Sequence, residues 1–234
     1  MEKDQKQRLR ELAKIRVDRI TEEFSKGFEF LEEYPRSVTF FGSSLMGQDD
    51  PNCVSARTLA GRIAKELGFA VLTGGGPGIM EAANRGAKEA GGVSLALTIK
   101  LPNPQIVNDY LTKQVDPDYF FVRKVCLSFL AEAYIFYPGG LGTLDEFFEL
   151  MTLMQTQKIK GVPLICVGKD YWKHVESLMR SVLLERGLIL PEDMNIATVT
   201  DNHDEVLELI KNAPVRVLEE LQGLPAEMVA DHLK

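Results

Sequence analysis

The part of the chain with the clearest chemical potential is the run Pro-Gly-Gly-Leu-Gly-Thr-Leu-Asp-Glu at residues 138–146. It follows an apolar run at residues 133–137 that is typical of a buried strand, and it leads into a segment with helical spacing. A strand that passes through glycines into a helix presents free backbone N–H groups at the positive end of the helix dipole. The run therefore predicts an anion site, most often for a phosphate, with the carboxylate of Glu146 within one helical turn of it.

A helix cap is the competing interpretation of the same run. Thr143 and Glu146 have the Ser/Thr-x-x-Glu spacing of a capping box, and Asp145 adds a charge that is favourable at a helix start. A cap alone does not require Gly139 and Gly140, so the glycines favour the anion site. The sequence by itself leaves both interpretations open.

A second glycine-rich turn, Gly-Gly-Gly-Pro-Gly at residues 74–78, follows another apolar run at residues 70–73. One interpretation is a tight strand-to-helix turn, in which glycine supplies positive φ and lets the helix approach the sheet. The turn holds more glycines than that role requires, which favours a phosphate or nucleotide contact. The spacing matches neither Gly-x-Gly-x-x-Gly nor a P-loop, because no Gly-Lys-Ser/Thr follows.

Two adjacent cations, Arg123 and Lys124, stand where a helix is predicted to begin. Cations are unfavourable at the positive end of a helix dipole, so the pair makes physical sense if an anion lies beside it. Solvated surface charge is the alternative, and the sequence does not decide between the two.

Strands and helices are predicted to alternate along the main part of the chain. The strand-like runs lie at residues 37–42, 70–73, 93–99, 133–137, 163–167 and 196–200, with a short candidate at 119–121. The helical segments lie at residues 52–67, 79–90, 123–131, 142–158, 171–186 and 204–211, and residues 100–117 are expected to be irregular. Because the strand runs are apolar on both faces, we expect a parallel sheet covered by helices on both sides. Ligands of such sheets lie beyond the carboxyl ends of the strands, where both glycine turns fall.

Three regions are predicted along the chain. Residues 1–34 are charge-rich with apolar positions at helical spacing, which predicts one or two amphipathic helices over a sheet edge or a subunit contact. Residues 35–212 form the predicted catalytic domain, and residues 213–234 form a C-terminal tail.

Composition narrows the possible classes of protein. A hydrophobic fraction of 45% over 234 residues is enough to bury a sizeable core. The formal charge of −7 argues against a nucleic acid polymer as partner, for which a basic surface is typical. Cys53, Cys126 and Cys166 show no metal or redox spacing and are expected to be small buried hydrophobic residues. With neither a bilayer-spanning run nor a secretory signal, the sequence predicts a cytoplasmic protein without membrane contact.

The two glycine runs and the Arg-Lys pair together resemble the Lonely Guy family. Its members are cytokinin riboside 5′-monophosphate phosphoribohydrolases and bacterial relatives that are often labelled lysine decarboxylases. The similarity extends from about residue 37 to about residue 213. It implies a Rossmann-like, doubly wound α/β domain with extra N-terminal helices, typically dimeric, with sites near the subunit contact.

The resemblance also implies roles for particular residues. Arg123 falls on the family's catalytic arginine and Glu146 on its catalytic glutamate. The positions that the resemblance implies to contact the nucleotide are Lys124, Gly140, Leu141, Gly142, Thr143 and Thr152. Further predicted substrate-binding positions are Gly75, Gly76, Glu81, Gln105 and Gly139. Plant-type members have a glutamate where this chain has Gln105, and Met-His where this chain has Phe120-Phe121. Both differences affect the expected base pocket more than the chemistry at the sugar.

The implied function is hydrolysis of the N-glycosidic bond of AMP-like or cytokinin nucleotides to the free base and ribose 5-phosphate, with no cofactor and no metal. The expected partners are a nucleoside 5′-monophosphate and a second copy of the chain in a homodimer. Two alternatives stay open: a non-catalytic carrier of a nucleotide or of the molybdenum cofactor, and a nucleotide-sensing regulator that uses residues 1–34.

Other polar residues receive less specific interpretations. Nothing marks Lys100 or Lys169 as a Schiff-base lysine, so the sequence does not favour a pyridoxal-phosphate decarboxylase. His174, His203 and His232 are isolated in charged segments and are expected at the surface.

Overall fold

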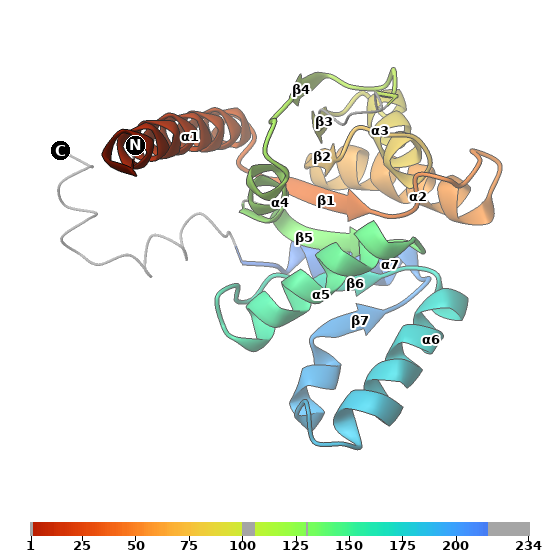
Figure 1. The fold of residues 1–234 in the computed structure, drawn as a ribbon. Helices are drawn as coiled ribbons and strands as arrows, with labels where there is room; N and C mark the ends of the chain where they lie inside the picture. Colours follow the sequence, from red (N-terminus) through yellow and green to blue (C-terminus); the bar gives the residue numbers. More distant parts are fainter. Residues whose placement is uncertain (1, 100–105, 130, 215–234) are drawn as a thin grey trace.

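The computed structural model describes residues 2–99, 106–129 and 131–214, and these contain a central sheet of seven parallel strands (Figure 1). In chain order the strands are β1 (Ser37–Phe41), β2 (Ala70–Thr73), β3 (Ser94–Leu97), β4 (Lys113–Val115), β5 (Ala131–Phe136), β6 (Leu164–Cys166) and β7 (Ala197–Val199). Across the sheet their order is β4-β3-β2-β1-β5-β6-β7, and every pairing is parallel. The Rossmann-like, doubly wound α/β fold expected from the sequence is confirmed.

Helices cover both faces of this sheet. They are α1 (Glu2–Glu32), α2 (Pro51–Arg62), α3 (Ile79–Glu89), α4 (Phe120–Phe129), α5 (Leu141–Gln155), α6 (Lys169–Leu178) and α7 (His203–Lys211), with short turns η1 (Ile63–Leu67), η2 (Met179–Leu184) and η3 (Pro191–Asn195). One face packs against α1, α4, α5 and α6, with Phe147 and Trp172 among the buried side chains. The other face packs against α2, α3 and α7, with Ala82 and Val206 in its core.

Strand β5 illustrates why the strands are apolar along their whole length. Tyr134 and Phe136 belong to the cluster beneath α5, whereas Ala133 and Ile135 belong to the cluster on the opposite face. All four side chains are fully buried. A central parallel strand loses water from both faces, and each large apolar side chain that it buries stabilises the fold by about 2 kcal/mol.

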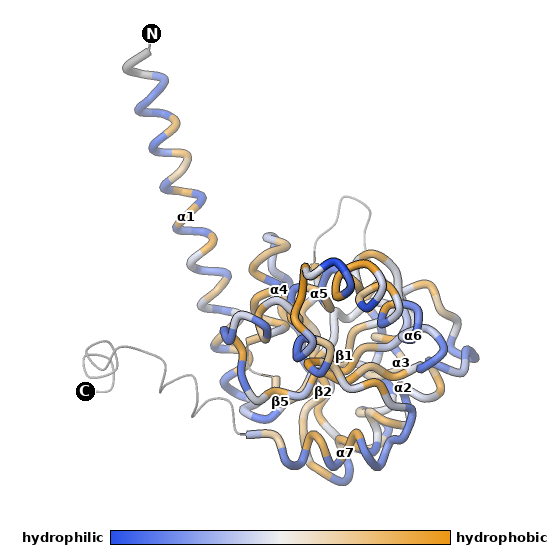
Figure 2. The backbone as a smooth tube through the Cα atoms, turned by 90° about the horizontal axis from the view of Figure 1, so that it is seen from below, coloured by the Kyte–Doolittle hydropathy of each residue, from blue (hydrophilic) through white to orange (hydrophobic). Residues whose placement is uncertain are grey.

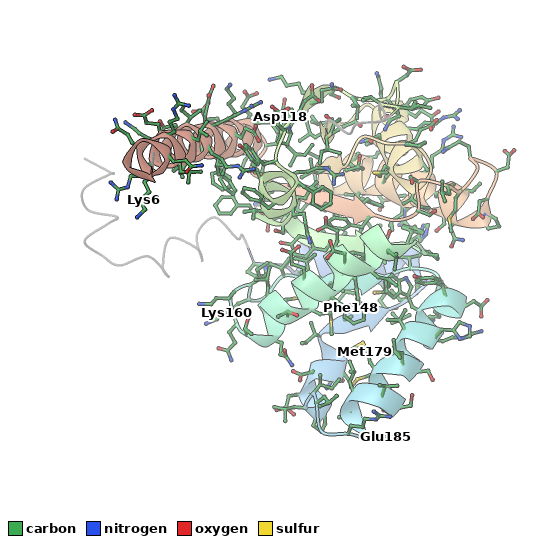
Figure 3. All side chains as sticks on the ribbon, in the orientation of Figure 1. Lys6, Asp118, Phe148, Lys160, Met179 and Glu185 are labelled. Atoms are coloured by element: carbon green, nitrogen blue, oxygen red, sulfur yellow. The ribbon has the colours of Figure 1, made fainter. Side chains whose placement is uncertain are left out.

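Helix α1 is a single helix of 31 residues, and its first half projects away from the domain (Figure 2). Lys6 lies on this projecting half (Figure 3). Its exposed apolar side chains are 59–65% accessible: Leu9, Leu12, Ile15 and Val17. From Ile20 onward the apolar side chains of α1 pack against the core of the domain. Across the residues that the structure describes, no helix combines the length and the apolar character needed to cross a bilayer.

The strand predicted at residues 119–121 is wrong, because α4 already begins at Phe120. The carboxylate of Glu23 in α1 accepts hydrogen bonds from the backbone N–H groups of Asp118 and Tyr119 and so defines the start of the helix. A cap supplied by such a distant residue leaves no local signal in the sequence.

The irregular stretch predicted at residues 100–117 contains the edge strand β4. Lys113–Val115 pairs with Leu95–Leu97 of β3, and its side chains are exposed or half-buried. The sequence of such an edge strand contains no apolar run from which it could be predicted. Residues 100–105, which include Gln105, lie outside the described part of the chain.

The three cysteines are buried free thiols, as expected. Burial raises the pKa of Cys53 to about 11 and that of Cys126 to about 12, so both are inert thiols at neutral pH. The prediction of a surface position is wrong for His203. This residue is half-buried, and its Nε2 lies 2.9 Å from Oγ of Ser55 in α2.

Candidate active site

The order of the strands reverses between β1 and β5, which lie side by side at the centre of the sheet (Figure 1). At such a switch point the loops after the two strands diverge and leave a crevice at their carboxyl ends. A cavity of about 390 Å³ lies at this place, within the usual size range of small-molecule sites. Its polar and backbone lining includes Ser43, Ser44, Gly74, Arg123, Gly140, Leu141, Gly142, Thr143 and Glu146.

Helix α5 starts at this cavity. Gly140 is its N-cap residue, and among the residues that the structure describes no side chain caps the helix. The capping-box interpretation is therefore wrong: Thr143 and Glu146 are the third and sixth residues of the helix, and both are buried. Because the first N–H groups of a helix have no intrahelical partner, the exposed turn at Leu141 and Gly142 offers backbone donors to an anion.

The glycine loop before α5 is held by hydrogen bonds from two neighbouring segments, the loop after β1 and helix α6. Ser43 N–H donates to the carbonyl of Pro138 at 3.0 Å, and Oη of Tyr171 in α6 donates to the carbonyl of Gly139 at 2.7 Å. A methyl group at Gly139 would collide with Oγ1 of Thr143. Position 139 must therefore be glycine for the loop to lie this close to the first turn of α5.

Arg123 enters the cavity from α4, where it ends the first helical turn. Its Nε donates to the carbonyl of Leu97 at 2.8 Å, which fixes the guanidinium beside the end of β3. A methyl group at Gly74 would collide with Nη2 of Arg123, so the first glycine of the 74–78 turn makes room for this side chain. Burial lowers the pKa of Arg123 and Glu146 opposes this, but a guanidinium stays charged at any pH of interest.

Glu146 lines the same cavity from α5 and is only 7% exposed. Burial raises the pKa of this carboxyl to about 7, and the negative charges of Glu149 and Asp145 add to the effect. The positive charges of Lys124 and Arg123 oppose it. A carboxyl with this pKa exchanges a proton near neutral pH, which is the property that acid–base chemistry requires.

Lys124 and Thr152 lie outside this cavity, on a shallow surface depression between α4 and α5. Lys124 Nζ pairs with Asp145 at 2.7 Å and with Glu149 at 2.9 Å. Burial alone would lower the pKa of Lys124, but these two ion pairs outweigh it and raise the pKa. The positive charge of Lys124 lowers the pKa of Glu146 from this position. The substrate-binding roles of Lys124 and Thr152 stay predictions.

The 74–78 turn contributes Gly74 and the nearby Met80 to the cavity lining. Backbone groups of the next two glycines are already engaged: Gly75 N–H donates to Oγ1 of Thr73, and the carbonyls of Gly75 and Gly76 accept from Asn108. The substrate-binding roles of Gly75, Gly76 and the half-buried Glu81 stay predictions.

Sequence reasoning missed the loop after β1. Ser43 and Ser44 line the cavity, and Leu45 beside them is 94% exposed. The signal was present, since Gly-Ser-Ser directly follows the first predicted strand and that strand borders the switch point.

A family model described as "possible lysine decarboxylase" matches residues 80–210 of this chain. The chain belongs to this family. The Lonely Guy proteins belong to it too, so the resemblance found in the motifs is confirmed.

Three related proteins illustrate how similar this chain is in sequence to other proteins. An uncharacterized protein of Archaeoglobus fulgidus is 31% identical over 101 residues, which are 43% of this chain and 65% of that protein. A cytokinin riboside 5′-monophosphate phosphoribohydrolase of Mycobacterium tuberculosis is 30% identical over 60% of this chain and 75% of its own length. An enzyme of the same name from Rhodococcoides fascians is 24% identical over 76% of this chain and 90% of its own length.

A solved structure with a similar fold is the molybdenum cofactor binding protein of Rippkaea orientalis. Its TM-score is 0.53 at 22% identity, over 75% of this chain and 94% of that protein. At this identity the likeness concerns the fold alone.

Proposed function

We propose that this protein hydrolyses the N-glycosidic bond of a nucleoside 5′-monophosphate and releases the free base and ribose 5-phosphate. The observation that carries the proposal is the meeting of Arg123 from α4 and Glu146 from α5 in one cavity at a helix N-terminus. Two of its relatives are named as enzymes that act on cytokinin riboside 5′-monophosphate.

The 5′-phosphate binds to the backbone N–H groups at the start of α5, from Gly140 to Thr143. Donors at a helix start favour an anion, and the exposed Gly140, Leu141 and Gly142 leave room for a group as large as a phosphate. The carbonyl contacts of Ser43 and Tyr171 hold the loop in place while it binds.

Glu146 and Arg123 act on the sugar and the base. Cleavage passes through an oxocarbenium-like state with positive charge on the ribose, which the carboxylate of Glu146 stabilises. Glu146 also directs a water molecule to C1′ and takes its proton. The departing base leaves with the electrons of the broken bond and takes a proton from bulk water, which later regains the proton held by Glu146. Arg123 orients the ribose or the phosphate and helps to hold the departing base.

The test is the release of free base from AMP, GMP, IMP, CMP, UMP and isopentenyladenosine 5′-monophosphate, followed by chromatography. We expect purine nucleotides to yield base, Glu146→Gln to bind them without turnover, and Arg123→Ala to release base at a lower but measurable rate. Glu149→Gln is the matched control, because Glu149 lies one turn further along α5 and pairs with Lys124 instead. Tight binding of nucleotide by the parent chain with no base released from any of the six would instead indicate a carrier.

We further propose that the protein forms a homodimer through α4 and the start of α5. Four apolar side chains of α4 and of the start of α5 are exposed: Phe120 is 49% accessible, Phe121 47%, Val125 37% and Leu141 88%. Leu141 and Phe148 of α5 (Figure 3) line the depression that also contains Lys124. Burying such side chains in a second copy is favourable by the hydrophobic effect. Val125→Glu should shift the molar mass measured by light scattering from dimer to monomer, and an unchanged dimer would place the contact elsewhere.

A further inference from the structure

The junction between α1 and α4 contains an unusual helix cap. Oε2 of Glu23 in α1 accepts hydrogen bonds from the backbone N–H of Asp118 at 3.1 Å and of Tyr119 at 3.0 Å, the two residues before α4. Glu23 stands 95 positions before Asp118 in the chain, and its side chain is only 13% exposed. A carboxylate at this place satisfies donors that the helix cannot and is favoured by the helix dipole.

The same cap lies one hydrogen bond away from the catalytic arginine. The backbone N–H of Arg123 donates to the carbonyl of Tyr119 at 3.2 Å and closes the first turn of α4. The N–H of Tyr119, at the start of the same turn, is bound by the carboxylate of Glu23. The guanidinium is fixed in turn by the carbonyl of Leu97. A shift of Tyr119 is therefore transmitted to the backbone of Arg123.

Close packing makes the junction rigid. A methyl group at Gly27 of α1 would lie 2.6 Å from Sγ of Cys126 in α4, so the two helices cross with little space between them. The rings of Phe28 and Phe129 are 4.3 Å apart. Arg19 forms an ion pair with Asp118, which lies near the C-terminal part of α1 and two residues before α4 (Figure 3).

We propose that Glu23 is a positioning residue for Arg123, in a part of the chain that precedes the 80–210 region matched by the family model. Its carboxylate fixes the first turn of α4 and thereby the place of the guanidinium in the cavity, given the hydrolase activity proposed above. Misplacing a catalytic group by about 1 Å can lower a rate about a hundredfold. The phosphate site on α5 does not depend on α1, so the effect falls on kcat more than on KM.

The test compares Glu23→Ala, Glu23→Gln and Glu22→Ala by steady-state kinetics on the best nucleotide. We expect Glu23→Ala to lower kcat about tenfold or more with KM within about threefold, and Glu23→Gln to recover most of the loss, since its amide oxygen still accepts. Glu22→Ala is the matched control, because Glu22 is exposed on the same helix and pairs with Lys26 at 2.6 Å. In an Arg123→Ala background, Glu23→Ala should change kcat less than twofold.

Several results would overturn this role. These are an unchanged kcat in Glu23→Ala, no recovery in Glu23→Gln, or an undiminished effect of Glu23→Ala in the Arg123→Ala background. Amide hydrogen exchange is the readout that does not need turnover: the N–H groups of Tyr119 and Arg123 should exchange at least tenfold faster in Glu23→Ala than in Glu22→Ala. If the parent chain releases no base at all, the hydrolase proposal fails, while equal exchange in the two variants refutes the positioning role separately.

Discussion

Replacing Glu146 by glutamine is expected to abolish hydrolysis and yet to stabilise the folded protein above neutral pH. Burial raises the pKa of this carboxyl to about 7 from an ordinary value of 4.5. In the unfolded chain the carboxyl is exposed and has its ordinary pKa. Above about pH 7 the carboxyl is ionised in both states, and burial makes the ionised form unfavourable in the folded state only. The difference between the two pKa values corresponds to about 3 kcal/mol at alkaline pH. Glutamine has nearly the same shape and no charge to desolvate, so it removes that cost.

The sign of the pH dependence follows from proton binding. Between pH 4.5 and about 7 the folded state holds this proton more tightly than the unfolded state does. The contribution of Glu146 to stability therefore falls as pH rises through this window, and it is constant above it. The glutamine variant lacks this fall. Variant and parent should have similar free energies of unfolding near pH 4.5, and the variant should be more stable by about 3 kcal/mol at pH 8.

Urea unfolding at pH 4.5, 6 and 8 measures the free energies, and Glu149→Gln is the control. Glu149 is 34% exposed and pairs with Lys124 at 2.9 Å, so its loss should change stability by less than about 1 kcal/mol at pH 8, and in the destabilising direction. Two results would show that burial does not destabilise the Glu146 carboxylate. In one, Glu146→Gln is less stable than the parent at pH 8; in the other, the free energies of unfolding of variant and parent differ by the same amount at all three pH values. Glu146 would then lack the raised pKa on which its proposed acid–base role depends.

Three further outcomes are expected. The kcat/KM should fall about tenfold per pH unit below about pH 7 and be constant above it, because the reaction needs Glu146 ionised. A pH–rate profile from pH 5 to 9 measures this, and a flat profile contradicts it. Gly74→Ala should lower kcat at least about tenfold with an unchanged melting temperature, because a methyl group there displaces Nη2 of Arg123. Tyr171→Phe should raise KM about fivefold with kcat retained, because it removes a bond worth about 1 kcal/mol to the Gly139 carbonyl; isothermal titration with the product ribose 5-phosphate would show the same loss.

Much of the fold was predictable because its signals are local. The central strands are buried on both faces, so apolar runs such as residues 70–73 and 133–137 marked them within one or two residues. The polar edge strand Lys113–Val115 was missed for the converse reason: one of its edges has no partner strand and its side chains meet water. The rest of the error lies at element ends, where α4 starts earlier than predicted.

The site was predictable in its parts and not in its assembly. Glycine runs after strands located the rim of the cavity, but the spacing of Thr143 and Glu146 fitted a helix cap as well as a buried carboxyl. The point that decides between them is the start of α5 at Leu141, and no local rule sets that start. The glycine of position 74 was expected to serve backbone geometry or a ligand, whereas it makes room for the side chain of Arg123, which is distant in sequence.

The two side chains proposed to be catalytic thus depend on different parts of the chain. Glu146 is placed by the glycine run directly before it and by the neighbours Ser43 and Tyr171 that hold that run. Arg123 is placed by α4, whose first turn is capped from α1. The glycine motif therefore accounts for the proposed phosphate site and for the position of the Glu146 carboxyl, but not for the position of the Arg123 guanidinium. Changes in α1 should accordingly alter turnover without altering nucleotide affinity, whereas loss of a contact that holds the glycine run, as in Tyr171→Phe, should weaken nucleotide affinity.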